Sequence, residues 1–143
     1  MHCPSAQPDD PQAAILGVVR REEETARVQI LPQTLPPETL TGYVPSSLRP
    51  TEVLRFAAPC AEHACLHFDG ERCQLASRIV AHLPAVIERL PPCAIRRTCR
   101  WFSQEGAEAC RRCPQIITET YSPSDVLREV AQPTNRRDQA YGT

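Results

Sequence analysis

The chain has 143 residues, a formal net charge of −1 and 41% hydrophobic residues. This length supports one small domain, and the near-neutral charge gives no reason to expect nucleic acid or an acidic membrane as a partner. Five glycines leave little room for a nucleotide-binding loop. The chain shows neither a signal-peptide pattern nor an apolar run of membrane-spanning length. We therefore expect a cytoplasmic protein whose cysteines stay reduced.

Strand and turn signals dominate the first part of the chain. Residues 1–12 are polar and rich in proline, so we expect a disordered tail there. Apolar and polar residues alternate on either side of a charged stretch between Ala13 and Leu31, which predicts a β-hairpin with a charged tip. Prolines interrupt the rest of the 13–50 segment, which we expect to be extended. A short helix should then run from Thr51 to Phe56.

Residues 51–131 form the predicted cysteine-rich, metal-binding domain. Apolar residues recur at three- and four-residue steps from Leu75 to Leu90, which predicts the longest helix of the chain. Pro84 should kink this helix or start a second one, because proline lacks the backbone N–H of a helical hydrogen bond. A shorter helix is expected between Ser103 and Arg111.

The last elements follow the cysteines. An extended run is expected at 116–121, and Ser122 followed by Pro123 predicts the start of a helix that ends at Ala131. Residues 132–143 look like a tail. We therefore expect a small α+β fold stabilised by metal, in which an N-terminal β-hairpin precedes a cysteine-rich helical domain with long loops.

Eight cysteines are the most informative feature of this sequence. Cys3 lies in the expected tail, and the other seven form one block: Cys60, Cys65, Cys73, Cys93, Cys99, Cys110 and Cys113. Packing alone does not require so many cysteines in so short a stretch. In a reducing compartment they are better explained as metal ligands than as disulfides, although a disulfide framework or metal-free thiols stay open.

The spacing of the cysteines favours an iron–sulfur cluster. Structural zinc sites present two close ligand pairs, whereas only Cys110 and Cys113 form a C-x2-C pair here, and Pro114 follows it as in bacterial ferredoxins. Each thiolate of a [4Fe-4S] cluster binds its own iron, so irregular spacing is tolerated. We predict one or two [4Fe-4S] clusters, with Zn as the alternative. Zinc ligands would come from the last four cysteines or from Cys60, His63, Cys65 and His67.

Seven cysteines are one short of two complete clusters. In one arrangement the last four cysteines hold a cluster, while Cys60, Cys65 and Cys73 hold a second that takes His63, His67, Cys3 or an outside group as its fourth ligand. In the other, a single cluster draws ligands from both halves of the block. A cluster with three protein thiolates would leave one iron open to act as a Lewis acid.

Arginines accompany the second half of the block. Arg96, Arg97 and Arg100 lie close in sequence to Cys93 and Cys99, and their side chains can donate hydrogen bonds to cluster sulfurs. Trp101 is expected to shield the metal from water. These four residues, Arg96, Arg97, Arg100 and Trp101, are the predicted cofactor-binding residues beside the thiolates.

Three segments, HFDGERCQLA, PPCAIRRTCRW and ACRRCP, resemble small bacterial cysteine-rich proteins that are sometimes labelled nitrogen-fixation proteins. The resemblance covers about the middle third of the chain and implies an iron–sulfur role. The C-x2-C-x5-C core and the Gly-Trp turn of the WhiB-like iron–sulfur regulators are missing, which argues against direct control of transcription.

Electron transfer to or from a redox partner protein is the function that these features favour. A zinc-stabilised adaptor is the first alternative, and a cluster enzyme or redox sensor with an open iron is the second. The sequence shows no Ser/His/Asp arrangement, phosphate-binding loop or pair of catalytic carboxylates, so we lean away from an enzyme and assign no catalytic residue.

Overall fold

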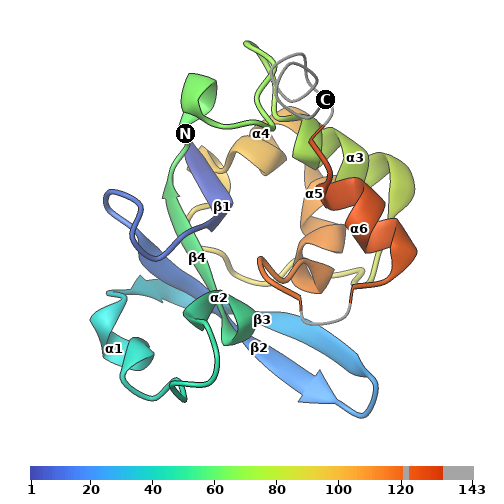
Figure 1. Ribbon diagram of the computed structural model, residues 1–143. Helices are drawn as coiled ribbons and strands as arrows, with labels where there is room; N and C mark the ends of the chain where they lie inside the picture. The colour runs from blue at the N-terminus through green and yellow to red at the C-terminus, as the bar shows by residue number, and fades with distance from the viewer. Residues whose placement is uncertain (121–122, 134–143) are drawn as a thin grey trace, which may run out of the picture.

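A computed structural model describes residues 1–120 and 123–133. Its sheet has four antiparallel strands in the order β1-β4-β2-β3 (Figure 1). The strands are β1 (His2–Ala6), β2 (Ala14–Glu22), β3 (Thr25–Leu35) and β4 (Leu54–Pro59). Together with six α-helices in the described residues, they form a small mixed α and β fold. The metal stabilisation expected from the sequence stays a prediction.

The predicted β-hairpin is confirmed. Strands β2 and β3 pair from Glu22 opposite Thr25 at the tip, and the charged residues of the turn are exposed. Near the other end the register shifts between Ile15 and Gly17. A Cβ atom on Gly17 would lie 2.6 Å from Val28 Cγ1, so only glycine lets the two strands approach this closely.

The N-terminal segment differs from the disordered tail expected for residues 1–12. His2–Ala6 forms strand β1, which pairs with β4 so that His2 lies opposite Pro59 and Cys3 opposite Ala58. Pro4 and Ala6 are buried. A polar, proline-rich composition predicts how a segment behaves in isolation. This segment is ordered because it pairs with the edge of β4, a strand distant in sequence.

The helix expected from Thr51 to Phe56 is right only in its first turn. Helix α2 (Pro50–Val53) is a single turn, and the chain then enters β4. Leu54 and Phe56 are buried against Ile15 of β2, so tertiary packing decides the conformation here. One further helical turn, α1 (Glu38–Thr41), lies in the segment expected to be extended.

The remaining helices follow the start of the cysteine block and gather beside the sheet (Figure 1). They are α3 (Gln74–His82), α4 (Arg100–Glu105), α5 (Ala107–Arg112) and α6 (Asp125–Ala131), with short 3-10 turns at Glu62–Ala64, Arg96–Thr98 and Cys113–Gln115.

All four of these helices differ from the boundaries expected from the sequence. Helix α3 stops before Leu83 instead of reaching Leu90, since Pro84 and the prolines that follow cannot continue it. The single helix expected at 103–111 is two helices, which Gly106 separates at a φ of 72°. Helix α6 begins after Ser124, whose hydroxyl accepts a hydrogen bond from Leu127 N at 3.2 Å.

The extended run at 116–121 is not a strand at Ile116 and Ile117. Tyr121 and Ser122, and the predicted tail from residue 134 onward, lie outside the described residues. In the part of the chain that the structure describes, no helix is long and apolar enough to cross a membrane.

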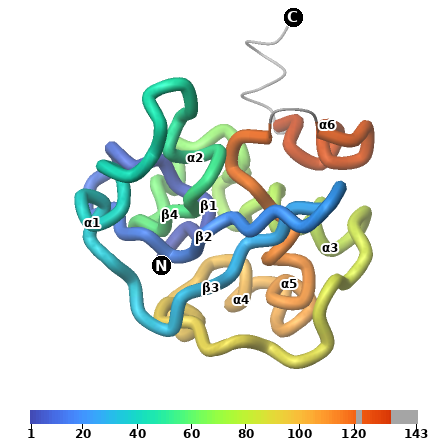
Figure 2. The backbone as a smooth tube through the Cα atoms, turned by 90° about the horizontal axis from the view of Figure 1, so that it is seen from below, coloured from blue at the N-terminus to red at the C-terminus, as the bar shows by residue number. Residues whose placement is uncertain are grey.

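Both faces of the sheet are covered. Ile15 and Leu16 are neighbours in β2, yet they belong to two different clusters of buried residues, because successive side chains of a strand point to opposite faces. The Ile15 cluster lies near α1 and α2. The Leu16 cluster includes Trp101, Cys73 and Cys99 and packs against α3 to α6 (Figures 1 and 2). Cysteines are therefore part of the larger core.

Candidate metal centres

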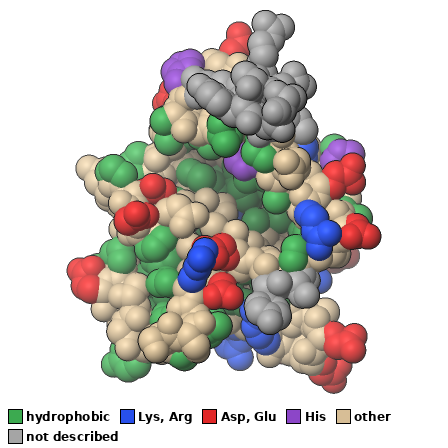
Figure 3. Space-filling model, in the orientation of Figure 1, with side chains coloured by type: hydrophobic (Ala, Val, Ile, Leu, Met, Phe, Trp, Pro, Cys, Tyr) green, Lys and Arg blue, Asp and Glu red, His purple; other side chains and the backbone are tan. Residues whose placement is uncertain are grey.

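The eight cysteines are all free and fall into two sets of four. The outer set lines a cavity of about 930 Å³ and consists of Cys3, Cys60, Cys65 and Cys73. The inner set lines a small cavity of about 30 Å³ and consists of Cys93, Cys99, Cys110 and Cys113. Figure 3 shows the larger cavity as a recess lined mainly by hydrophobic side chains.

Electrostatic coupling between the thiols gives the same two sets. The pKa of Cys3 is raised by its burial and then by Cys73, Cys60 and Cys65, all of the outer set. The pKa values of Cys99 and Cys110 are likewise raised by burial and by other members of the inner set. The cavities that the cysteines line and the electrostatic repulsion between their thiolates therefore give the same two sets of four.

Strand β1 brings Cys3 to the outer set. Its pairing with β4 continues past the strand end, where Cys60 N donates to Met1 O at 2.8 Å. Cys3 and Ser5 line the larger cavity, whereas Pro4 between them lines the smaller one. The alternation of side chains along a strand thus makes β1 part of the wall between the two sets.

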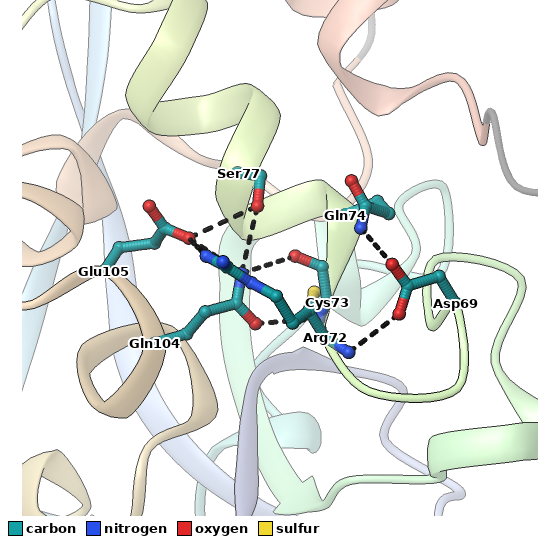
Figure 4. A network of polar contacts seen from close by, with 7 residues as sticks. All are labelled: Asp69, Arg72, Cys73, Gln74, Ser77, Gln104 and Glu105. Carbon is teal, nitrogen blue, oxygen red and sulfur yellow. Dashed lines mark hydrogen bonds and ion pairs between the residues drawn. The ribbon is translucent and has the colours of Figure 1, made fainter.

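Cys73 is held at the start of helix α3 by a side chain of helix α4. The Gln104 Oε1 atom accepts from Cys73 N at 2.8 Å, and Gln104 Nε2 donates to Cys73 O at 2.8 Å (Figure 4). Beside this clamp, Arg72 and Glu105 form an ion pair of 2.7 Å. Because the N–H and the carbonyl of Cys73 both have hydrogen-bond partners, the backbone that carries its sulfur is held in place.

The loop before Cys73 has the turn expected at Asp69 and Gly70. Asp69 Oδ1 accepts from the backbone N–H groups of Glu71 and Arg72 at 2.9 and 2.8 Å, and Gly70 has a φ of 109°. The hydrogen bond from Arg72, followed by that from Glu71, holds the pKa of Asp69 below its usual value. This turn returns the chain from Cys65 to Cys73.

The inner set is gathered by short elements. Cys99 caps the start of α4, Cys110 lies in α5, and Cys113 begins the 3-10 turn that follows. Leu16 and Ile30 of the sheet, with Trp101, Phe102 and Ala109, form the apolar part of the lining. The inner set therefore lies between the sheet and the helices, with Cys99 buried and the other three cysteines partly exposed.

Burial raises the pKa of several thiols. It raises the pKa of Cys3 to about 12 and that of Cys99 to about 11, from 9.0 in each case. The pKa values of Cys73 and Cys110 are also raised, chiefly by burial. These thiols are protonated at neutral pH in the metal-free protein, so a metal must displace protons to bind them.

Positively charged side chains lie against the sulfurs of both sets. Arg100 Nε donates to Cys60 Sγ at 3.1 Å, and Arg55 Nη2 donates to Cys113 Sγ at 2.8 Å. A hydrogen bond and the charge of Arg96 act to lower the pKa of Cys110, against the larger effect of burial. Sulfur accepts such bonds best as a thiolate, which is also the form that binds metal.

The structure places three of the four predicted cofactor-binding residues at the sets. Arg100 and Trp101 line the larger cavity, and Arg96 and Trp101 line the smaller one. Arg97 is exposed and lines neither of these cavities. Arg96 and Arg97 are adjacent in the 3-10 turn Arg96–Thr98, yet only Arg96 lines a cavity. Closeness in sequence to the cysteines does not reveal this difference.

The two candidate histidine ligands are placed differently. His63 is exposed and packs against the ring of Phe68, with the centroids 5.3 Å apart. His67 lines the larger cavity, and its Nδ1 lies 2.8 Å from Arg78 Nη2. Of the fourth ligands considered for the outer set, Cys3 is the one that completes a set of four thiols.

Sequence reasoning missed two residues of these sites. Arg55 reaches Cys113 from β4, and Gln104 clamps Cys73 from α4, both across long sequence separations. The position of Cys3 had one local signal, because Cys3-Pro4 repeats the Cys-Pro pair at Cys113-Pro114. No comparable signal marks Arg55 or Gln104.

In residues 1–120 and 123–133, no group of three or more Cys, His, Asp or Glu side chains is arranged to hold a metal ion. Ligands of one ion must converge on a single point, whereas the four thiolates of a cubane cluster each bind a separate iron. The comparisons with family models, curated proteins and solved structures give no match for this chain.

Proposed function

We propose that this protein carries two [4Fe-4S] clusters, one on the outer set and one on the inner set, and transfers electrons to or from a partner protein. The observation that carries the proposal is the division of the cysteines into two sets of four, since four thiolates are the full complement of one such cluster. Cys3 supplies the eighth thiol, so the proposal needs no open iron.

The surroundings of the thiols support clusters as their occupants. Thiolate-ligated clusters carry negative charge, and Arg55 and Arg100 present hydrogen-bond donors to one sulfur in each set. Apolar side chains also line the cavity of the inner set, and they limit the contact of water with a redox centre there.

The relation between the two sets supports electron transfer. The outer set lines a recess at the surface, where a partner can approach (Figure 3), while the inner set lines a separate, smaller cavity. Trp101 lines both cavities and is only 2% exposed, so one aromatic side chain separates the two sites. An electron from a reduced partner would enter at the outer cluster and pass to the inner one.

Metal and sulfide analysis of the anaerobically purified chain tests this proposal. We expect about eight irons and about eight acid-labile sulfides per chain, with paramagnetic resonance signals of reduced [4Fe-4S] clusters after dithionite treatment. Bound zinc without sulfide would overturn it and support the zinc-stabilised adaptor.

The grouping is tested by removing one thiol from each set. Cys3→Ser and Cys99→Ser should each lose about four irons while the other cluster keeps its resonance signal. Ser5→Ala is the matched control for Cys3, because Ser5 lines the same cavity from the same strand without offering a thiol. Full iron content in the Cys3→Ser protein would contradict the assignment of Cys3.

A further inference from the structure

The strongest unexplained feature of the interior is a buried positive charge. Arg55 lies in β4 and is 0% exposed. Its guanidinium donates to Pro4 O at 2.6 Å, to Cys113 O at 2.5 Å and to Ile116 O at 3.1 Å. A fourth bond reaches Cys113 Sγ at 2.8 Å.

None of these acceptors is a carboxylate. Three are backbone carbonyls, and the fourth is the sulfur of Cys113. None of the ion pairs among the described residues involves Arg55. Burying a guanidinium without a counter-charge is expensive, so a purely structural tie between three carbonyls would be served better by a neutral donor.

The location of Arg55 indicates what the counter-charge is. Its guanidinium lies 5.3 Å from the ring of Trp101, the side chain that lines both cavities. One of its bonds reaches Pro4, next to Cys3 of the outer set, and two reach Cys113 of the inner set. The sulfur that accepts its hydrogen bond therefore belongs to the inner set.

We propose that Arg55 is the charge-compensating residue of the inner cluster and sets its reduction potential above the value that it would otherwise have. This inference rests on the proposed function. Reduction adds one electron from the partner to a [4Fe-4S]²⁺ cluster and forms [4Fe-4S]⁺, with no proton required. A buried cation with an N–H bond to a ligand sulfur stabilises the more negative, reduced form.

The outer set offers a matched comparison within the same chain. Arg100 donates to Cys60 Sγ at 3.1 Å, as Arg55 does to Cys113. However, Arg100 also lies 3.8 Å from a carboxylate oxygen of Glu62, so its charge already has a partner. Arg55 should therefore influence its cluster more strongly than Arg100 influences the outer one.

The experiment is a redox titration followed by paramagnetic resonance on the anaerobically prepared full chain. The Cys3→Ser background isolates the inner cluster, and the Cys99→Ser background isolates the outer one. In the first background, Arg55→Gln should lower the reduced-to-oxidised ratio at a fixed potential roughly tenfold, which is a shift of about 59 mV for one electron. In the second background the same substitution should leave the outer cluster unchanged.

Two further variants keep the outcome decisive. Arg55→Lys retains the charge but loses the forked set of donors, so it should lower the inner potential by less than Arg55→Gln. If Arg55→Gln does not fold, a lowered potential in Arg55→Lys supports the inference and an unchanged one overturns it. Arg100→Gln, measured on the inner cluster, should have no effect.

Failure of this inference is distinguishable from failure of the proposed function. A Cys3→Ser protein without iron and sulfide would overturn the two-cluster assignment itself. A loaded inner cluster whose potential is the same before and after the Arg55→Lys and Arg55→Gln substitutions would overturn only the role of Arg55.

Discussion

At the scale of single residues, the thiols show how burial and metal binding oppose each other. Burial raises the pKa of Cys3 to about 12 and that of Cys99 to about 11, because a thiolate is poorly solvated in the interior. The same burial protects a bound cluster from water and oxidants. In the metal-free chain Cys3 and Cys99 are therefore neutral thiols that pack as small apolar groups, and a bound metal would convert them to paired thiolates.

These raised pKa values predict how the stability of the metal-free, reduced protein depends on pH. Below pH 9 the thiol proton is present in both the folded and the unfolded chain, so the stabilisation is complete. Above pH 9 the unfolded chain releases its proton first, and the free energy of unfolding should fall by about 1.4 kcal/mol per pH unit for each shifted thiol until the folded-state pKa is reached.

Urea unfolding of the metal-free chain at about pH 7.5, 9 and 10 measures this dependence. The Cys3→Ser protein lacks one of the shifted thiols, so its decline across the upper half of this range should be shallower. A free energy of unfolding that stays constant over the whole range would show that Cys3 and Cys99 are not shielded as the structure describes.

At the scale of elements, helix α4 links the two sets. Its first residue follows Cys99 of the inner set, and Gln104 near its end clamps the backbone of Cys73 in the outer set. Roughly a turn and a half of helix therefore lies between Cys99 and the side chain that holds Cys73, so the helix fixes the position of one set relative to the other.

Removing this clamp should weaken the outer cluster alone. Gln104→Leu leaves the N–H of Cys73 without its partner, at a cost of about 1–3 kcal/mol for a buried group, and leaves its carbonyl with only the 3.4 Å bond from Ser77 N. We expect faster loss of iron from the outer cluster on exposure to chelator, with the inner resonance signal retained.

Gln115→Leu is the matched control for that experiment. Gln115 also donates a side-chain bond to a backbone carbonyl, that of Pro84 at 2.7 Å, but Pro84 lines neither of the two cavities. The outer cluster of the Gln115→Leu protein should lose iron at the same rate as that of the unaltered protein. Equal loss in the two variants would mean that Gln104 acts only on general stability.

The sequence indicates elements best where the signal is local. Alternation predicts the hairpin of β2 and β3, and Asp69-Gly70 predicts the turn before Cys73. Strand β1 has no such signal, because its order depends on β4, which lies far along the chain. The cysteine pattern predicts ligands, but their division into two sets requires the register that places Cys3 beside Cys60.

At the scale of the whole molecule, the two cysteine sets and the core are not separable. Cys73 and Cys99 belong to the same group of buried residues as Trp101, Ile79 and Val130, which joins the sheet to helices α3 to α6. A cluster on each set would cross-link segments that otherwise meet only through side-chain packing, and would restrict the unfolded chain as well.

Removal of the clusters should therefore lower the thermal midpoint. Treatment with chelator and oxidant, followed by reduction of the thiols, should decrease Tm by at least about 10 °C, since the loss of a few kcal/mol shifts a chain of this size by that much. Calorimetry or circular dichroism of the loaded and stripped protein gives the measurement. Identical midpoints would mean that the sets contribute nothing to stability through a bound group.

The position of Cys3 in β1 also has a consequence for biosynthesis. The inner set spans a short stretch of chain, so it can acquire its cluster as soon as that stretch leaves the ribosome and folds. Cys3 is made first, but it meets its partners only after β4 has been synthesised and has paired with β1. Completion of the outer set thus depends on closure of the N-terminal strand. Because Cys73 is made before Cys93, a nascent chain holds all four outer thiols before the first inner one, and a protein with two clusters would be able to load the outer site first.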